Sequence, residues 1–227
     1  MKKITILIPV FNEPNTLEKI LQQVESVDFC GLNKEIILID DFSTDGTRKL
    51  YSKITHKVIY HDENKGKGAA LRTGIKAASG DIIIIQDADL EYNPIDYVPL
   101  VELIKSNKAD VVYGSRFADG RNSENFLFLS FLANKFLTFM TRILYNAKIT
   151  DMETCYKAFR ADIIKNIEIK SNRFDFEPEI TAKILKKGVR FRELPISYNA
   201  RTTEAGKKIT WCDGVQAVWT LLREKFN

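Results

Sequence analysis

Short apolar runs alternate with amphipathic segments along the first half of the chain. The runs that we expect to form strands are residues 4–10, 35–39, 57–60, 81–85 and 111–113. Residues 82–85 are all isoleucine, and such continuous apolarity is typical of a strand covered on both faces. The alternation predicts an α/β fold with a mostly parallel sheet and helices on both faces.

Helical spacing of apolar residues appears first just after residue 15. Asn15 and Glu18 have the spacing of a capping box, and an apolar face follows them. The residues of this face are Leu17, Ile20, Leu21 and Val24. We expect the first helix to begin at Asn15.

Two later segments combine apolar and helical character. Residues 126–145 are rich in Phe and Leu but contain Asn134, Lys135 and Arg142, so they fall short of the roughly 20 apolar residues that span a bilayer. Residues 211–226 predict an amphipathic C-terminal helix with one broad apolar face. That face consists of Trp211, Val215, Val218, Trp219, Leu222 and Phe226.

The bulk composition is that of one folded domain. The 227 residues are enough for one core, and no linker-like stretch divides them, so we expect a single domain over residues 1–227. The net charge of +4 comes without a dense basic stripe, which argues against nucleic-acid binding. Three scattered cysteines have neither disulfide-framework nor zinc-site spacing, and we expect a cytoplasmic protein.

Carboxylates follow the isoleucine run. In open α/β sheets ligands bind at the carboxyl ends of the strands. Asp87, Asp89 and Glu91 offer hard oxygen ligands that suit Mg²⁺ or Mn²⁺ bound together with a diphosphate. The alternative is an acidic loop that caps the next helix.

A second acidic strand end is formed by residues 40 and 41. Asp41 could accept hydrogen bonds from a nucleobase or a ribose, as the strand-end acid of dinucleotide folds does. For the neighbouring Ser43 and Thr44, helix capping is the simpler interpretation.

Residues 65–70 open a helix with small residues and two lysines, which favours an anion at the helix N-terminus near Lys67. Packing of small residues on the sheet explains this turn equally well. The motifs of P-loop ATPases and of dinucleotide oxidoreductases are both absent from the sequence.

Arg116, Arg201 and Lys207 are isolated cations, and such residues are usually only solvated. They are candidates for a functional role here because a reaction in which a nucleoside diphosphate leaves would need fixed positive charge at the phosphates. We expect residues 201–208 to close over the donor.

Taken together and in this order, these motifs resemble the dolichyl-phosphate mannose synthase-like branch of glycosyltransferase family 2. The matching stretches are residues 9–13, 39–47, 65–68, 87–90, 114–116, 150–157 and 193–198, followed by Arg201 and Lys207. The chain departs from the family pattern at three positions. Phe11 stands where Tyr is usual, and Phe42 and Cys155 each stand where Gly is usual.

The resemblance implies a GT-A type fold, with residues 1–116 as the nucleotide-sugar half and residues 117–227 as the acceptor half. It implies that the nucleoside lies on Pro9, Phe11, Glu13, Ile39 and Asp41. It further implies that the metal and diphosphate are held by Asp87, Ala88, Asp89 and Glu91. The catalytic groups implied at the phosphates are Asp89, Arg116, Arg201 and Lys207.

The activity implied is inverting transfer of a hexose from a GDP-mannose or UDP-glucose type donor to a polyprenyl phosphate. The protein would work at the cytoplasmic side of a membrane, with peripheral contact. Transfer to a sugar hydroxyl and a non-catalytic nucleotide-sugar-binding subunit are the alternatives. A hydroxyl acceptor would need a carboxylate base, for which the candidates are Asp151, Asp175, Glu177 and Glu179.

Overall fold

One sheet of seven strands organises the fold. The computed structural model describes residues 1–29, 31–119, 128–200 and 211–227. The strand order across the sheet is β3-β2-β1-β4-β6-β5-β7. The strands are β1 (Lys3–Val10), β2 (Asn33–Asp40), β3 (Lys57–Tyr60), β4 (Ile82–Ile85), β5 (Val111–Ser115), β6 (Lys157–Arg160) and β7 (Phe191–Pro195).

Parallel pairing brings the ends of the first strands to one edge. β1 pairs in parallel with both β2 and β4, and β5 pairs in parallel with β7. In the described part of the chain, β6 is the one strand that runs against its neighbours. The predicted mostly parallel sheet is therefore confirmed, with five strands close to their expected positions and β6 and β7 not foreseen.

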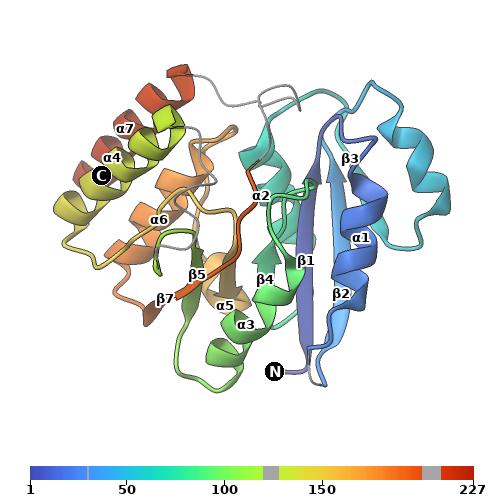
Figure 1. Ribbon diagram of the computed structural model, residues 1–227, viewed down its shortest axis with the longest axis horizontal. Helices are drawn as coiled ribbons and strands as arrows, with labels where there is room; N and C mark the ends of the chain where they lie inside the picture. The colour runs from blue at the N-terminus through green and yellow to red at the C-terminus, as the bar shows by residue number, and fades with distance from the viewer. Residues whose placement is uncertain (30, 120–127, 201–210) are drawn as a thin grey trace.

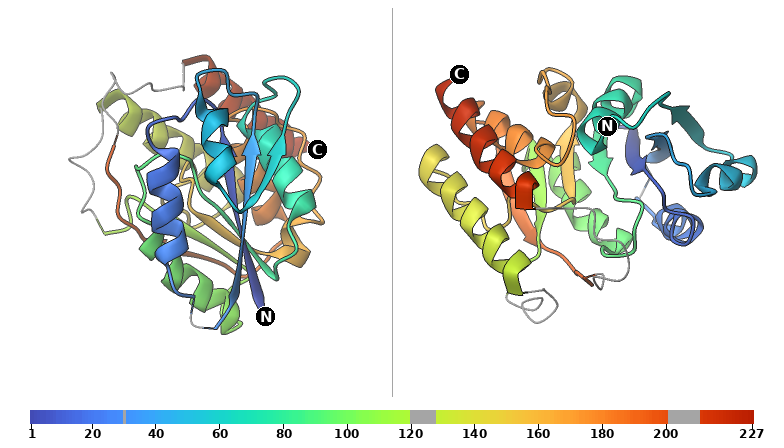
Figure 2. Two further views of the ribbon diagram at one scale, coloured as in Figure 1. Left: turned by 90° about the vertical axis from the view of Figure 1, so that its right-hand side faces the viewer. Right: turned by 90° about the horizontal axis from the view of Figure 1, so that it is seen from above.

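Helices cover both faces of this sheet (Figures 1 and 2). On one face lie α1 (Leu17–Ser26) and α3 (Tyr97–Lys105), and on the other lie α2 (Lys67–Ala77), α5 (Ala161–Ile164) and α6 (Phe176–Lys186). Two short 3-10 helices, η1 (Thr47–Lys53) and η2 (Pro94–Asp96), complete the connections. Coverage on both sides explains why β4 can be apolar at every position.

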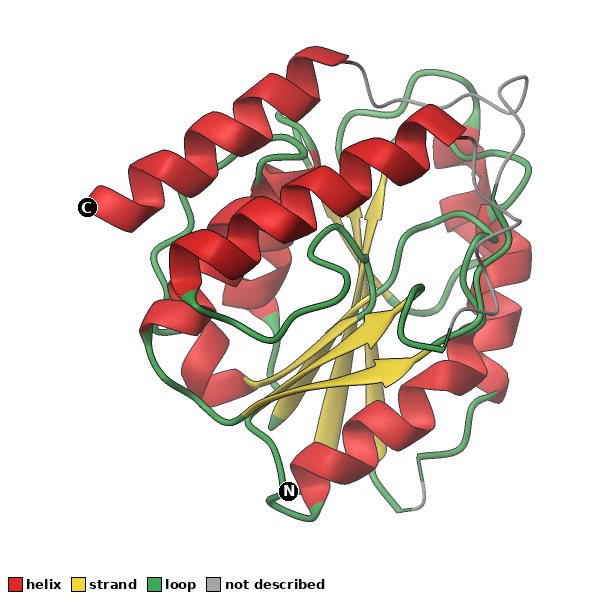
Figure 3. Ribbon diagram, turned by 60° about the vertical axis from the view of Figure 1, so that its left-hand side comes forward, coloured by secondary structure: helices red, strands yellow, loops and turns green. Residues whose placement is uncertain are grey.

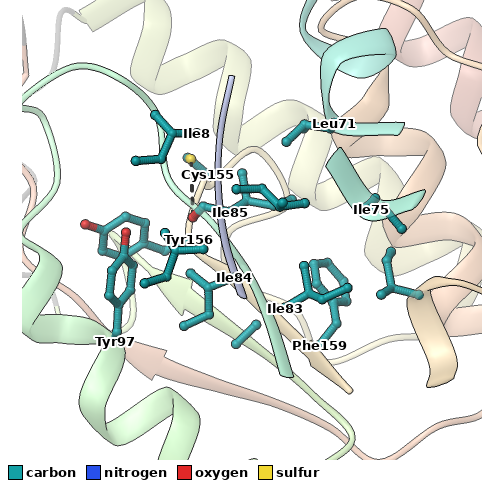
Figure 4. Close-up of a cluster of buried hydrophobic side chains, with 14 of the residues drawn as sticks. Ile8, Leu71, Ile75, Ile83, Ile84, Ile85, Tyr97, Cys155, Tyr156 and Phe159 are labelled. Carbon is teal, nitrogen blue, oxygen red and sulfur yellow. Dashed lines mark hydrogen bonds between the residues drawn. The ribbon is translucent and has the colours of Figure 1, made fainter. Parts of the chain in front are cut away.

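The core is centred on β4. All four of its isoleucines are at most 1% exposed. Figure 4 shows Ile84 on the side of Tyr97 from α3, and Ile83 with Phe159 on the side of Ile75 from α2. Ile84 and Ile83 thus face opposite helix layers, and β4 is fixed between α3 and α2.

The start of α1 differs from the expected capping box. The N-cap residue is Thr16, and no side chain caps the first turn. Instead the Thr16 hydroxyl donates a hydrogen bond of 2.8 Å to Glu13 Oε2. The capping box at Asn15 and Glu18 was therefore wrong, whereas the predicted apolar face of α1 is buried.

Two long helices, α4 (Phe128–Tyr145) and α7 (Trp211–Phe226), lie side by side against α6 (Figures 1 and 3). They are joined where the Tyr145 hydroxyl donates to Leu221 O at 2.7 Å. The helix α7 was predicted at these bounds, but its buried residues include Ala217 and Leu221, while Val215, Trp219 and Phe226 are exposed. Within the described residues we find no helix long and apolar enough to cross a membrane.

The first turn of α2 packs closely on the segment before α6. Ala69 N donates to Asn172 O at 3.1 Å. A Cβ atom at Gly66 would lie 2.4 Å from Asn172 O, and one at Gly68 would lie 2.6 Å from Ser171 O. The small residues of this turn therefore serve close packing, but against the segment before α6 and not against the sheet as the alternative interpretation had it.

We predict that Gly68→Ala destabilises the protein by about 1–3 kcal/mol, because the new methyl group meets backbone that has no room to yield. Gly214→Ala in α7 is the matched control, since no atom lies within 4 Å of its Cβ position. The control should be neutral or gain up to about 1 kcal/mol of helix stability. Urea unfolding measures both, and equal unfolding midpoints would contradict the close contact at Gly68.

Candidate active site

Three turns meet at the carboxyl edge of β1, β2 and β4. Asp41 N donates to Val10 O at 2.8 Å, and Gln86 N donates to Leu7 O at 2.9 Å. These bonds continue the parallel ladder beyond the strands. The turns after β1, β2 and β4 are thereby held next to one another.

The turn after β1 is bound to the turn after β2. Asn12 N donates to Ser43 Oγ at 3.0 Å, and Glu13 N donates to Thr47 Oγ1 at 2.9 Å. Thr44 N donates in return to Asn12 Oδ1 at 2.9 Å. The structure thus brings the expected nucleoside residues Pro9, Phe11 and Glu13 beside the turn that contains Asp41, with Pro9 opposite Ile39 in the ladder.

Ile39 and Asp41 have structural partners in this arrangement. The Ile39 side chain is fully buried, so a ligand would reach it through its backbone. The Asp41 carboxylate accepts hydrogen bonds from His61 Nδ1 at 2.7 Å, Lys65 N at 2.9 Å and Gly66 N at 2.7 Å. Asp41 therefore anchors the turn that opens α2, and its contact with a nucleoside stays a prediction.

His61 is a residue that sequence reasoning missed. Its Nε2 lies 3.0 Å from the Thr73 hydroxyl, so the imidazole links Asp41 to α2. An isolated histidine after a short strand carries no sequence signal for this role.

The turn after Asp41 contains an unfavourable backbone conformation. Phe42 has φ of +66°, in the left-handed region that favours glycine. This explains why glycine is usual at this position in the pattern that the chain resembles. The Phe42 ring is 38% exposed and lies 5.2 Å from the Arg48 guanidinium, a cation–π contact that offsets part of the strain.

Asp87, at the end of β4, is paired with Lys67. The Lys67 ammonium lies 2.8 Å from Asp87 Oδ1 and 2.9 Å from Glu177 Oε1 of α6. Burial alone would lower the pKa of Lys67, but the charges of Asp87 and Glu177 outweigh it and hold that pKa well above its ordinary value. The half-buried Lys67 is thus a counter-ion of Asp87 and Glu177, and its expected contact with a phosphate stays a prediction.

Asp89 and Glu91 point to different surroundings. Asp89 Oδ1 accepts a hydrogen bond of 3.0 Å from Glu91 N, whereas Glu91 Oε2 accepts one of 3.2 Å from the Tyr198 hydroxyl. Among the residues described, no three acidic, histidine or cysteine side chains gather as a metal site. Glu91 is thus held by Tyr198, and its role as a metal ligand stays a prediction.

The donor set still fits a metal bound with substrate. Asp87 and Asp89 flank the buried Ala88 and are both partly exposed. Mg²⁺ is commonly held by one or two carboxylates together with substrate phosphates, so these two side chains would be its protein ligands. Such a metal would stabilise charge on the departing diphosphate.

A cavity of about 480 Å³ opens beside Glu91. It lies between α1, the segment after β4 and the segment after β7. Its polar lining includes Gln23, Glu91, Asn93, Asp96, Tyr198 and Asn199. Carboxylates, amides and phenols of this kind can bind the hydroxyl groups of a sugar.

Arg116, expected at a phosphate, is bound to Asp151. Its Nε and Nη2 donate to the two carboxylate oxygens at 2.7 and 2.8 Å, and its backbone N–H donates to the same group at 3.0 Å. Its guanidinium also stacks 5.2 Å from the Tyr198 ring. A phosphate would have to share this buried arginine with Asp151. Arg201 and Lys207, with the expected closing segment 201–208, lie outside the described residues.

Further ionisable groups are buried behind Glu177. Burial and the charge of Glu177 raise the pKa of Glu153 to about 8. Burial lowers the pKa of Lys157, whose ammonium donates to the Met152 and Thr154 carbonyls and lies 4.7 Å from the Tyr113 ring. The sequence marked residues 150–157 only by resemblance, and no pattern showed that their charges are buried.

Comparisons with known proteins identify the family and the fold of the chain. Residues 5–168 match the family model described as "Glycosyl transferase family 2". The chain is 32% identical to the dolichol-phosphate mannosyltransferase of Pyrococcus furiosus over 90% of its own length, and it spans 59% of that relative. It is 25% identical to the UDP-N-acetylglucosamine–dolichyl-phosphate N-acetylglucosaminyltransferase of Methanococcus voltae, over 86% of this chain and 85% of that one.

Among solved structures, the chain is similar to glucosyl-3-phosphoglycerate synthase from Mycobacterium tuberculosis in complex with Mn²⁺, uridine diphosphate and glucosyl-3-phosphoglycerate. The TM-score is 0.76 at 19% identity, with 99% of this chain and 80% of the other covered. This likeness shows the fold, which is of the predicted GT-A type.

We predict that the free energy of unfolding falls between about pH 5 and pH 8 because of Glu153. Its folded pKa of about 8 lies above that of an exposed carboxyl, so the folded state binds the extra proton and loses stability as the pH rises. Each unit of pKa difference is worth about 1.4 kcal/mol. In urea unfolding at pH 5, 6.5 and 8, Glu153→Gln should flatten this fall. A fall as steep as that of the wild type would contradict the buried acid.

Proposed function

Because the chain belongs to glycosyl transferase family 2, we propose that it is an inverting, metal-dependent hexosyltransferase. The donor is a nucleoside-diphosphate sugar of the GDP-mannose or UDP-glucose type, and the acceptor is a polyprenyl phosphate at a membrane surface. The observation that carries the acceptor assignment is a pair of exposed apolar stripes on α4 and α7. The names of both relatives, which contain dolichol phosphate or dolichyl phosphate, support the same assignment.

The donor occupies the carboxyl edge of the sheet. Its nucleoside lies by the joined turns that contain Phe11 and Asp41, and its diphosphate lies by Asp87 and Asp89. A divalent metal there supplies positive charge as the diphosphate leaves. The chain's own residues orient the leaving group, since the turns are fixed to one another by hydrogen bonds from backbone amides to side-chain hydroxyls.

The state of the candidate bases favours an acceptor that is already ionised. Three of the four candidate carboxylates are already engaged by a lysine or an arginine in ion pairs, so their oxygens are not free to accept a proton from an acceptor hydroxyl. The pairs are Asp151 with Arg116, Glu177 with Lys67, and Glu179 with Lys183. A phosphate oxygen is anionic near neutral pH and needs no base, whereas a sugar hydroxyl does.

The stripe on α4 consists of Leu132, Phe136, Phe139 and Ile143, each more than half exposed. On α7 the same spacing places Val215, Trp219 and Phe226 at the surface, with Leu222 half-buried. Residues at i, i+4, i+7 and i+11 lie along one side of a helix. Two adjacent helices therefore each present an apolar side that the described residues do not cover.

Such a surface suits the interface of a bilayer. Amphipathic helices with Trp and Phe on the apolar side and basic residues beside it lie in the headgroup region. Arg142 is exposed near the end of α4, where it can meet lipid phosphates. A contact between two copies of the chain is the competing explanation of the stripes, and a hydroxyl acceptor is the competing function.

We predict that Asp89→Asn lowers transfer by about a hundredfold or more while the protein stays folded, because charge on the departing diphosphate is then poorly stabilised. Thermal unfolding with GDP or UDP, with and without Mn²⁺, reports binding separately from turnover. The gain in the free energy of unfolding that depends on Mn²⁺, about 2.7 kcal/mol at a hundredfold excess over the dissociation constant, should disappear in this variant.

The exposed acid of a surface ion pair supplies the control, Asp162→Asn, which should keep both activity and the gain that depends on Mn²⁺. Full activity of Asp89→Asn, or of the wild type in excess EDTA, would remove metal dependence from the proposal.

We predict that the double variant Phe136→Glu/Trp219→Glu loses binding to anionic vesicles and loses transfer to undecaprenyl phosphate embedded in them. Two charges placed in the apolar stripes oppose insertion into the interface. Transfer to a short, water-soluble prenyl phosphate should persist, because the donor site is intact. Co-sedimentation and product extraction measure the two effects.

Ile95→Glu is the matched control, since Ile95 is an exposed isoleucine on η2 and not on either stripe. Its vesicle binding should remain. Unchanged vesicle binding of the double variant, together with dissociation of a dimer in sedimentation analysis, would assign the stripes to a subunit contact instead.

A further inference from the structure

Lys67 is shared between the diphosphate site and the interior of the acceptor half. Its ammonium contacts both oxygens of Asp87, at 2.8 and 3.1 Å, and Glu177 Oε1 at 2.9 Å. The lysine comes from the first turn of α2, and Glu177 comes from the first turn of α6. One cation thus balances two carboxylates, one in the turn after β4 and one on α6.

Glu177 can accept a further hydrogen bond from this ammonium. Its Oε2 is buried and has no hydrogen-bond partner among the described residues. An unsatisfied buried oxygen of a charged group is costly, so it marks a position where a donor is expected in another state. The nearest described ammonium that already contacts this carboxylate is that of Lys67.

A divalent cation at Asp87 would compete with Lys67 for the same oxygens. An ammonium and a metal ion cannot occupy the same lone pairs, and their charges repel each other at short range. Metal binding therefore requires Lys67 to withdraw from Asp87. It would be strongly unfavourable for the Lys67 ammonium to leave Asp87 without another carboxylate to pair with.

We propose that Lys67 and Glu177 form an exchangeable counter-ion pair for the metal site. Without metal, the Lys67 ammonium neutralises Asp87. When a divalent cation binds Asp87, the ammonium moves to both oxygens of Glu177, and Oε2 gains its missing donor. Lys67 and Glu177 are positioning residues in this scheme, since they act on the metal through Asp87.

This inference rests on the metal site of the proposed function but not on the sugar or the acceptor. It predicts that two substitutions at the two ends of one ion pair change the Mn²⁺ affinity in opposite directions. Glu177→Gln keeps the side-chain shape but removes the charge that receives Lys67, so it should weaken Mn²⁺ binding. Lys67→Met removes the competitor, so it should strengthen Mn²⁺ binding.

The test is a titration of each purified full-length variant with Mn²⁺ alone, in which free Mn²⁺ is measured by electron paramagnetic resonance. We expect the dissociation constant to rise about tenfold in Glu177→Gln and to fall about tenfold in Lys67→Met, a factor that corresponds to one pKa unit of interaction. In the double variant, Glu177→Gln should have no effect of its own. The matched control is Lys183→Met, which removes the lysine of another α6 ion pair and should leave Mn²⁺ affinity unchanged.

Circular dichroism checks that both variants fold. If Lys67→Met does not fold, the Mn²⁺ dissociation constant of Glu177→Gln tests the proposal on its own. An unchanged or tighter dissociation constant in Glu177→Gln, or the same direction of change in both variants, would overturn the exchange. Wild-type protein that binds no Mn²⁺, either alone or with saturating GDP or UDP, would overturn it together with the metal part of the proposed function. Failure of lipid transfer with these shifts intact would refute only the acceptor assignment.

Discussion

Crowding of carboxylates at one edge of the sheet is the constraint on which the rest of the structure depends. Parallel pairing of β1 with β2 and β4 brings Asp40, Asp41 and Asp87 to that edge. Asp40 and Asp41 are buried and Asp87 is half-buried, and such carboxylates are tolerated only with partners that satisfy their charge and their oxygens. Each has such partners: Arg48 and Tyr51 for Asp40, His61 and two backbone amides for Asp41, and Lys67 for Asp87.

Ion pairs also connect residues 1–116 with residues 117–227. Lys67 reaches from α2 to Glu177 on α6, and Arg116 reaches from the end of β5 to Asp151 before β6. The glycines at the start of α2 allow the backbone contact that places Lys67 there. The proposed donor site therefore shares its ion pairs with the interior of the protein. The exposed stripes of α4 and α7 lie outside this network of ion pairs, which leaves them available for a surface role.

The sequence was sufficient for the fold class and for the strands of the first half, because their apolar runs are continuous and lie between clear turn residues. It did not predict β6, which has four residues of mixed polarity, or β7, whose burial is partial. For the candidate site, motif order pointed to three turns that the structure brings together, while the roles of their residues stay predictions. The partners of Lys67 and Arg116 could not be foreseen, since an ion pair between residues 67 and 177 leaves no local pattern. The outward direction of the α7 stripe was also unpredictable, because periodicity defines an apolar side but not what covers it.

The central claim is that the acceptor is a lipid phosphate, and identification of the product tests it most directly. The purified protein would be incubated with Mn²⁺, with GDP-mannose or UDP-glucose, and with vesicles that contain undecaprenyl phosphate, in the presence of an equal concentration of water-soluble glycosides. Mass spectrometry and anomeric analysis would follow extraction into organic solvent. The account predicts a hexosyl phosphoprenol with inverted anomeric configuration. Hexose recovered only on the soluble glycosides, with no lipid-linked product, would contradict it.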